Sequence, residues 1–496
     1  MKKEKYIVSI DQSTSGTKVL LVNSQGQIIH KCSMSHTQYY PKTGWVEHDP
    51  VEIYENVKTL LNEMAQTTAV PENELTVLAI TNQRETVVVW DKETGNPVYH
   101  AIVWQCRRTS DICKELKEQG YEDIIQSKTG LKVDPYFSAS KVKWIMDNVD
   151  GVREKAKAGK LLLGTIDSWL IWKLTGGKVH ATDYSNASRT LLFNIHTLQW
   201  DVELLDLFCI PKEMLPEVKD SNELFGVTED QNLPFNQLPI SGVIGDSQGA
   251  LFGQKCFEPG MAKATYGTGT SVLMQTGEIV DGTNGLVTSI AWGLNGKVSY
   301  ALEGIINCTG DTIKWLKEQL ELINDMEEVE HLANSLSDNE GVYLIPAFVG
   351  LGAPYWKPFT RAAIVGISRN TGKPHIVRAA LESIAYQVKD VMELMQSESN
   401  IQIKSVKVDG GATSNRFLMQ YQADMLNIDV IASKVAELSS MGSVYLAGLG
   451  VGIWNSTEEI NKLNQEHELY EPLMTGDVRD KYYQGWKQSV TGVLVC

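Results

Sequence analysis

The chain has 496 residues, 43% of them hydrophobic and 21% charged, a composition typical of a globular protein with about two to four domains. Its formal net charge is −16. This acidity disfavours binding to nucleic acid or to anionic membranes, because both interactions need basic patches on the protein.

The chain opens with short apolar segments separated by polar turns, a pattern that predicts strands. A helix is expected to begin at Pro50, because Asp49 before it is a good N-cap and apolar residues then recur at helical spacing. Another helix is expected from Gly249. The remaining predicted strands and one long amphipathic helix follow in chain order: strands at 6–10, 19–22, 28–29, 75–80, 86–90, 101–104, 240–244, 261–265, 271–274 and 406–408, and the helix at 371–395.

Strands that alternate with helices favour an α/β chain with two layered sheets. The break at Pro259-Gly260 places a boundary between two halves near residues 250–262. A similar hairpin rich in glycine and hydroxyl residues opens each half, at 11–17 and at 267–270. This recurrence indicates an internal duplication.

Two turns are candidates for phosphate binding, because the chain has no GxxxxGK[ST] loop. They lie at residues 13–17 and 268–271, where small side chains let backbone amides and hydroxyls converge on an anion. Lys18 can add a positive charge beside the first turn. The alternative interpretation of each turn alone, an ordinary β-turn, stays open.

Two aspartates follow strands at positions where α/β sheets place ligands, Asp11 and Asp246. Phosphoryl transfer needs a metal that neutralises charge and a carboxylate that accepts the proton of the attacking hydroxyl. Asp246 suits the base, and Asp11 suits a metal bound through water. The alternative for a single aspartate in such a place is helix capping.

Two further groups carry possible ligand contacts. Arg84 and Glu85 can bind neighbouring hydroxyls as donor and acceptor, and the face of Trp104 can cover the carbon side of a polyol. A surface ion pair and a core indole are the alternatives. Residues 408–415 place two glycines after a strand, so that the backbone can approach a flat ligand; a helix-starting turn with a polar cap is equally compatible.

Together these segments resemble the FGGY family of carbohydrate kinases, within the actin/hexokinase/heat-shock ATPase superfamily. The resemblance covers nearly the whole chain, and several of its segments are typical of the glycerol-phosphorylating branch. It rests on GWVEHDP (44–50), ITNQRET (80–86), AIVWQCRRT (101–109), ATDYSNASRT (181–190), YGTGT (266–270), IPAFVGLGAPYW (345–356), LESIAYQ (381–387) and VDGGA (408–412).

The resemblance implies an α/β fold with two actin-like, ribonuclease H-like domains, residues 1–253 and 254–496, and a ligand cleft between them. It implies ATP-dependent, magnesium-assisted phosphorylation of glycerol to sn-glycerol 3-phosphate as the two domains close. The N-terminal domain would bind the polyol and carry the first phosphate loop, and the C-terminal domain would bind the nucleotide.

The family pattern also implies the role of each matching residue. The polyol site is expected to contain Arg84, Glu85, Trp104, Tyr136, Asp246 and Ser247, with Asp246 as general base. The ATP site is expected to contain Thr14, Ser15, Gly16, Lys18, Thr268, Gly310, Lys314, Gly411 and Asn415. Asp11 and Asp246 are the expected magnesium partners.

Several residues depart from the family pattern. Lys18 replaces an arginine and Lys314 a glutamine, while Ser247 replaces a glutamine and Ser271 a phenylalanine at the polyol site. The two serines remove volume and therefore raise an alternative, a kinase of a four- or five-carbon polyol or ketose. An actin-like or heat-shock-like ATPase and a catalytically silent sugar sensor are further alternatives, which the polyol set and Asp246 disfavour.

The expected location is the cytoplasm. The seven cysteines form no CxxC pair and no zinc spacing, which suits a reducing compartment. The apolar stretch at 6–10 is too short for a signal peptide, and polar residues interrupt the stretch at 161–174. By family analogy the chain is expected to form a homodimer or homotetramer, without membrane insertion.

Overall fold

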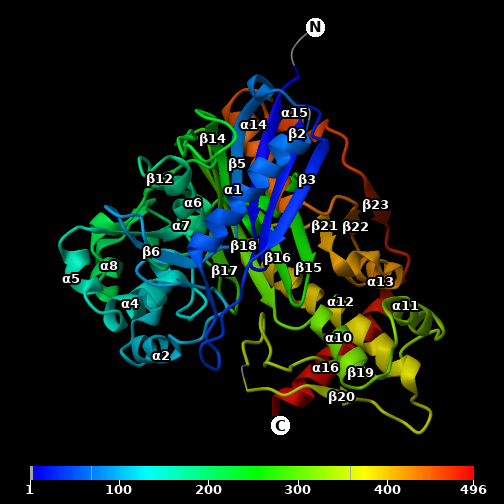
Figure 1. The fold of residues 1–496 in the computed structure, drawn as a ribbon. Coiled ribbons are helices and arrows are strands. Elements are labelled where there is room, and N and C mark those ends of the chain that lie inside the picture. The colour runs from blue at the N-terminus through cyan, green and yellow to red at the C-terminus, as the bar shows by residue number, and fades with distance from the viewer. Residues whose placement is uncertain (1–3, 69, 358, 496) are drawn as a thin grey trace.

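Two mixed β-sheets form the centre of the protein, as the ribbon in Figure 1 shows. The computed structural model describes residues 4–495 except 69 and 358. The first sheet has the strand order β13-β14-β5-β1-β2-β3. Its strands are β1 (Tyr6–Gln12), β2 (Gly16–Asn23), β3 (Ile28–Ser35), β5 (Leu75–Asn82), β13 (Gly226–Val227) and β14 (Pro239–Gly245).

The second sheet has the order β17-β18-β16-β15-β21-β22-β23. Its strands are β15 (Ala262–Tyr266), β16 (Thr270–Gly277), β17 (Val287–Leu294), β18 (Lys297–Ile306), β21 (Ser405–Gly410), β22 (Asp429–Ser433) and β23 (His467–Tyr470).

The two sheets repeat one topology. In the first, β1 pairs antiparallel with β2 and parallel with β5, and β5 pairs parallel with β14. In the second, β15 pairs antiparallel with β16 and parallel with β21, and β21 pairs parallel with β22. Both orders continue to an antiparallel strand, β13 or β23. This equivalence supports the duplication inferred from the two hairpins.

Two helices lie between the sheets, α9 (Asp246–Gly253) and α14 (Leu438–Gly450). One hydrophobic cluster joins residues of both, such as Leu251 and Val444, to Ile7 of the first sheet and Leu273 of the second. The C-terminal half therefore supplies a helix that packs against the N-terminal sheet. Because the cluster is shared, the two halves are held by a continuous apolar core.

Alternating residues of the first sheet point to its other face, where α1 (Pro50–Thr67) and α6 (Ile166–Leu174) cover it. Val8 and Ile10 face this layer, whereas Ile7 faces α14, as expected for a strand with side chains of period two. The start of α1 is as predicted, with the Asp49 side chain accepting a hydrogen bond from the Val51 N–H.

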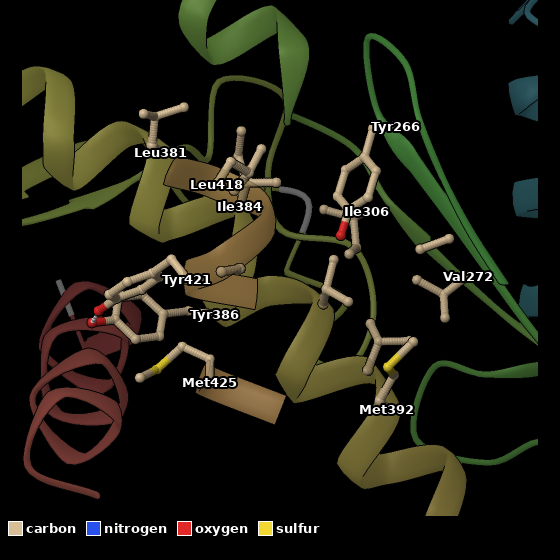
Figure 2. Close-up of a cluster of buried hydrophobic side chains, with 14 of the residues drawn as sticks. Tyr266, Val272, Ile306, Leu381, Ile384, Tyr386, Met392, Leu418, Tyr421 and Met425 are labelled. Atoms are coloured by element: carbon tan, nitrogen blue, oxygen red, sulfur yellow. Dashed lines mark hydrogen bonds between the residues drawn. The ribbon is translucent and has the colours of Figure 1, made fainter. Parts of the chain in front are cut away.

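Helices also cover the outer face of the second sheet, at the lower right of Figure 1. Figure 2 shows part of this core, in which Val272 and Ile306 of the sheet lie near Met392 of the long helix. The Tyr386 and Tyr421 hydroxyl oxygens lie 2.6 Å apart there. The elements of this layer are α10 (Gly310–Glu318), α11 (Met326–Asn334), α12 (Lys373–Ser399), α13 (Arg416–Leu426), α16 (Gly476–Val495), β19 (Tyr343–Ile345) and β20 (Ala363–Val365). The short α15 (Thr457–Asn461) lies instead beside the first sheet, where its Ile460 joins the cluster shared by the two halves.

A separate lobe projects from the N-terminal half, drawn in cyan and green at the left of Figure 1. A four-stranded sheet of order β4-β7-β6-β8 forms part of it. The strands and helices of this part of the chain are β4 (Glu47–His48), β6 (Val87–Asp91), β7 (Ala101–Ile102), β8 (Leu161–Thr165), β9 (Ala181–Asp183), β10 (Phe193–Asn194), β11 (Gln199–Trp200), β12 (Glu217–Lys219), α2 (Ser110–Glu118), α3 (Glu122–Thr129), α4 (Ser138–Asn148), α5 (Val152–Lys157), α7 (Tyr184–Ala187) and α8 (Val202–Phe208).

Several predicted boundaries were wrong; the strand expected at 28–29, for example, extends to Ser35. Three of the differences lie near the predicted site. The helix expected from Gly249 begins at Asp246, because the chain turns into α9 directly after β14. Asp11 lies within β1 rather than after it. The strand expected at 101–104 ends at Ile102, since Trp104 already belongs to a turn.

Along the described residues, no helix combines the length and the apolar character that crossing a membrane requires. The six cysteines that the structure describes are all free thiols, five of them buried, and Cys496 lies outside the described residues.

Candidate active site

The ends of three neighbouring strands bring the predicted polyol and metal residues together. Both β1 and β14 run parallel to β5, so their carboxyl ends lie at the same edge of the first sheet. Asp11 lies near the end of β1, Arg84 follows β5, and Asp246 follows β14. This edge is where α/β sheets bind ligands.

Asp246 is the first residue of α9 and keeps one carboxylate oxygen without a partner. Its Oδ1 accepts a hydrogen bond of 2.7 Å from the Ser247 N–H and lies 3.4 Å from Arg84 Nε. Its Oδ2 has no partner among the described residues, and 38% of the side chain is exposed. Gly245, not Asp246, is the N-cap of α9. The surrounding protein raises the pKa of Asp246 by desolvation, which Arg84 opposes.

Arg84 and Glu85 are buried, so they are not a surface ion pair. Glu85 has a left-handed backbone with φ of 61°, closed by a 2.7 Å hydrogen bond from the Thr86 N–H to the Arg84 carbonyl. Such a conformation costs about 1–3 kcal/mol and is typical of functional sites. A Cβ at Gly245 would come within 2.8 Å of Arg84 Cγ. Glycine at position 245 therefore leaves room for the Arg84 side chain.

Trp104 and Tyr136 form an aromatic wall beside these charges, with ring centroids 5.2 Å apart. The Trp104 Nε1–H donates a 2.9 Å hydrogen bond to Thr14 Oγ1, which ties the wall to the first phosphate turn. The indole is therefore half-buried and anchored, not a core residue. Burial raises the pKa of Tyr136, and its hydroxyl has no hydrogen-bond partner among the residues described.

The first phosphate turn presents its carbonyl groups to the protein. The carbonyl of Ser13 accepts a bond from Gln12 Nε2, that of Thr14 from Gln38 Nε2, and that of Ser15 from a backbone N–H. With these acceptors satisfied, the turn is suited to offer donors to an anion. Gly16 is needed here, because a Cβ would lie 2.6 Å from a backbone oxygen of β3.

Lys18 is not a free cation beside this turn. Its Nζ lies 2.7 Å from Glu437 Oε2 and 3.9 Å from Asp11 Oδ2. Burial raises the pKa of Asp11 to about 6, opposed by Lys18 and by a hydrogen bond from the Ser440 hydroxyl. The lysine charge is therefore shared between two carboxylates that lie before α14 and in β1.

The residues present fit a magnesium ion held largely through water. Asp11 and Asp246 interact electrostatically across the strand ends. Within the described ranges, no group of three or more His, Cys, Asp or Glu side chains could hold a metal. Two carboxylates with open coordination positions are typical of magnesium sites that also bind substrate phosphates.

Five of the nine predicted nucleotide residues line one cavity of about 1020 Å³ in the C-terminal half. Its apolar floor includes Leu381, Ile384 and Leu418, which belong to the core drawn in Figure 2. The predicted residues that line it are Thr268, Gly310, Lys314, Gly411 and Asn415. The first phosphate turn and Lys18 lie outside this lining.

Backbone geometry shapes the cavity. The turn after β15 contacts the start of α10, where the Gly310 N–H donates a 3.1 Å hydrogen bond to the Gly267 carbonyl. A Cβ at Gly310 would lie 2.5 Å from that oxygen, so only glycine allows this approach. Asn415 lines the cavity and also caps α13 through a hydrogen bond from the Leu418 N–H. The helix-cap interpretation of this segment is therefore confirmed, whereas its contact with a nucleotide stays a prediction.

Sequence reasoning missed Glu303 and Arg189, two buried charged residues that contact Arg84 and Glu85. We call the predicted polyol residues together with these two the polyol side. Glu303 Oε1 lies 2.8 Å from Arg84 Nη2, and Arg189 Nε donates a 2.6 Å bond to Glu85 Oε1. A glutamate inside an apolar, wholly buried stretch of β18 was the available signal. Ser247 contributes its N–H to Asp246, and the Ser271 hydroxyl donates to Glu303 at 3.3 Å.

Comparison with known proteins finds a family match and full-length relatives for this chain. The profile described as the FGGY family of carbohydrate kinases, N-terminal domain, matches residues 6–253, and its C-terminal counterpart matches residues 262–451. A glycerol kinase of Alkaliphilus metalliredigens is 52% identical over 99% of this chain and 98% of its own length. Glycerol kinase 2 of Thermotoga maritima is 51% identical over 99% of each chain.

Solved structures share the fold. The crystal structure of Plasmodium falciparum glycerol kinase with ADP has a TM-score of 0.95 at 38% identity, over 99% of this chain and 98% of that one. A ligand-bound xylulose kinase of Lactobacillus acidophilus has a TM-score of 0.87 at 21% identity, over 97% and 96%, and shows the fold alone. These likenesses confirm the predicted α/β fold with two actin-like domains. The chain belongs to the FGGY family of carbohydrate kinases.

Proposed function

We propose that the protein transfers the γ-phosphoryl group of ATP to a terminal hydroxyl of glycerol, giving sn-glycerol 3-phosphate and ADP. One observation carries this proposal: free acceptor and donor atoms converge at one edge of the first sheet. Asp246 Oδ2, Glu85 Oε2 and the Tyr136 hydroxyl have no partner among the described residues. They suit the hydroxyl groups of a small polyol.

Asp246 is the proposed general base. Its free Oδ2 accepts the proton of the attacking hydroxyl, whose oxygen forms a bond to the γ-phosphorus as the bond to the ADP oxygen breaks. Arg84 orients the base through Oδ1, at 3.4 Å. A raised pKa moves the carboxylate toward the working pH of a general base. Trp104 and Tyr136 cover the carbon side of the polyol.

The nucleotide would occupy the cavity of the C-terminal half. Glycines at 310 and 411 let the backbone approach the ligand, while Asn415 and Lys314 supply polar contacts at its edge. Thr268 and the first turn, through Thr14, Ser15, Gly16 and Lys18, would hold the phosphates from opposite sides. Bound magnesium would neutralise phosphate charge, with Asp11 and Asp246 holding its water shell.

Closure of two domains would bring the first turn to the nucleotide cavity and exclude water during transfer. The proposed domains are residues 1–253 and 254–496, with α14 of the second domain packed on the first sheet. We also propose a cytoplasmic location and a homodimeric or homotetrameric state, both by analogy with the family.

The alternatives have weaker support. The curated relatives at 50–52% identity are glycerol kinases, and the likeness to xylulose kinases shows the fold alone. A larger polyol or ketose is therefore not favoured, although Ser247 and Ser271 motivated it. An actin-like ATPase would not need the residues that form the proposed polyol site.

A substrate panel tests the proposal. ADP release is measured with glycerol, erythritol, threitol, xylitol, xylulose and ribulose at equal concentrations, and the product is identified by phosphorus NMR. Glycerol should give the highest kcat/KM. No stimulation by any of these compounds refutes a polyol kinase, and a clear preference for a four- or five-carbon compound refutes glycerol as the substrate.

A further inference from the structure

Four buried charges form a closed ring behind the proposed polyol site. Arg84 Nη2 lies 2.8 Å from Glu303 Oε1, and Glu303 Oε2 lies 2.7 Å from Arg189 Nη1. Arg189 Nε then lies 2.6 Å from Glu85 Oε1, which lies 3.7 Å from Arg84 Nε. The exposed fraction of each of these side chains is 4% or less.

The ring joins the two halves of the protein. Arg84, Glu85 and Arg189 belong to the N-terminal half, whereas Glu303 lies on β18 of the second sheet. In β18, Glu303 pairs with Leu273 of β16 and with Val287 of β17, so its backbone is fixed on both sides. The Glu303 backbone is therefore held firmly in the C-terminal half, while its carboxylate contacts the arginines of the N-terminal half.

Glu303 is the member that determines where Arg84 lies. It contacts two nitrogens of the Arg84 guanidinium, Nη1 at 3.3 Å and Nη2 at 2.8 Å, while Gln248 accepts a further bond from Nη1 at 3.2 Å. A bidentate contact fixes the plane of a guanidinium. With Nη1 and Nη2 occupied, Arg84 presents Nε to Asp246.

The balance of charges also indicates that Glu303 keeps Arg84 in place. The ring contains two arginines and two glutamates, so its own charges balance. The negative charge of Asp246 is then offset only in part, by Arg84 and by the buried Lys263, and its Oδ2 stays free. Burial alone would raise the pKa of Glu303, but Arg189 and Arg84 outweigh it and lower that pKa to about 2. Without the Glu303 charge, both arginines would lose a partner and Arg84 would be drawn onto Asp246.

We infer that Glu303 is a positioning residue of the polyol site, acting through Arg84 across the interface of the two halves. The inference rests on the proposed function, since it concerns the same substrate. It assigns no contact between Glu303 and the polyol. It states that the polyol site is complete only when β18 of the C-terminal half is docked against the N-terminal half.

The test compares Glu303→Gln with the unmodified enzyme, in parallel assays with glycerol varied and with ATP varied. Removing one partner of a buried charge pair is strongly unfavourable, so kcat/KM for glycerol should fall about tenfold or more, with a higher KM for glycerol. The KM for ATP and the dissociation constant of ADP should change less than about twofold. Thermal stabilisation by glycerol should shrink, and stabilisation by ADP should not.

Three variants control for a merely structural role. Glu382→Gln removes another wholly buried glutamate, which pairs with Arg378 at 2.7 Å outside the polyol side; it should lower the melting temperature and leave the KM for glycerol unchanged. Glu303→Asp keeps the charge and should recover part of the lost kcat/KM. Ser271→Ala removes the 3.3 Å hydrogen bond to Glu303 and should raise the KM for glycerol about twofold.

The outcomes separate the two hypotheses. If the unmodified enzyme phosphorylates glycerol and Glu303→Gln changes only its melting temperature, the positioning role is wrong and the proposed function stands. Should Glu303→Gln fail to fold, Glu303→Asp and Ser271→Ala decide, and an unchanged KM for glycerol in both overturns the role. If the unmodified enzyme phosphorylates no polyol, the proposed function fails and the inference fails with it.

Discussion

The polyol side of the candidate site is formed by side chains, whereas the nucleotide side is formed largely by backbone. The polyol side consists of charged and aromatic side chains: Arg84 and Glu85 are buried and paired with each other, and the half-buried Tyr136 packs against Trp104. The nucleotide side is a cavity of about 1020 Å³ shaped by backbone at glycines such as Gly310 and Gly411.

This difference has a physical consequence. Buried charges are sensitive to any change in their number, because an unpaired charge in a protein interior is costly. A cavity shaped by glycine backbone is sensitive to added volume instead. Changes of charge should therefore affect mainly the polyol side, and added side-chain atoms should affect mainly the nucleotide side.

The largest effect is expected for Asp246→Asn, which removes the proposed base while keeping its shape. An amide accepts no proton from the substrate hydroxyl, so kcat should fall about 10²–10⁴-fold, the range that general base catalysis contributes. Steady-state kinetics with saturating glycerol and ATP measure the loss. ADP should still bind with nearly its original dissociation constant.

Ser247→Ala is the matched control for this variant. Ser247 gives Asp246 its backbone N–H, which alanine retains, so kcat should stay within about threefold of the unmodified value. Turnover of Asp246→Asn at the unmodified rate would contradict the assignment of the base.

Acid should destabilise the protein in part through His48, which lies beside the segment that carries Arg84. Gln83, the neighbour of Arg84, donates its amide to His48 Nδ1 at 3.3 Å, while His48 Nε2 lies 2.7 Å from Gln38 Oε1. Both nitrogens of the His48 ring therefore form hydrogen bonds when the ring is neutral. Burial, with a contribution from His36, lowers the pKa of His48 to about 3.

Because the folded pKa lies below the ordinary value of 6.5, the unfolded chain binds the proton more readily between these two values. The stability from a neutral His48 is therefore complete above pH 6.5 and is lost as the pH falls toward 3. Each pH unit in this window costs up to about 1.4 kcal/mol of unfolding free energy. Urea unfolding at pH 7, 6 and 5 measures this slope, which His48→Gln should flatten; an equal slope in both proteins contradicts the mechanism.

The sequence predicted the two sides of the site unequally well. Strand ends and glycine turns are local features, so Asp246 and Gly411 could be proposed from the pattern around each of them, whereas Gly310 was implied only by the resemblance to the family. The partner that fixes Arg84 could not, because Glu303 is 219 residues away in the chain. Only the pairing of β18 within the second sheet and the packing of the two halves bring these side chains together.

The same reason explains the misplaced helix start and the role of Lys18. Periodicity does not show that α9 begins as β14 ends, because the Gly245 N–H at this junction donates to the hydroxyl of Ser185, which is 60 residues away in the chain. Lys18 looks like a free cation in sequence, yet Glu437, which precedes α14, lies 2.7 Å from its Nζ. Contacts across the chain determine both features.

Added volume should act on the nucleotide side alone. No atom lies within 4 Å of a Cβ built at Gly411, apart from its neighbours, so Gly411→Val fits the free protein and places its methyl groups in the cavity. The KM for ATP should rise about tenfold, as expected when a ligand loses its close approach to backbone. The KM for glycerol and the melting temperature should hardly change; a rise in both KM values would show that the two sides are not independent.

The smallest effect is expected for Lys314→Gln, at the edge of the nucleotide cavity. The Lys314 side chain is 63% exposed, with Glu318 at 3.8 Å, so solvent and salt screen its charge. The KM for ATP should rise only about two- to threefold, as for other exposed charge contacts, and the difference should fade as the salt concentration rises. Lys317→Gln is the control, because it makes the same charge change on α10 but does not line the cavity. If both variants raise the KM equally, the effect of Lys314 comes from net charge and not from its place at the cavity.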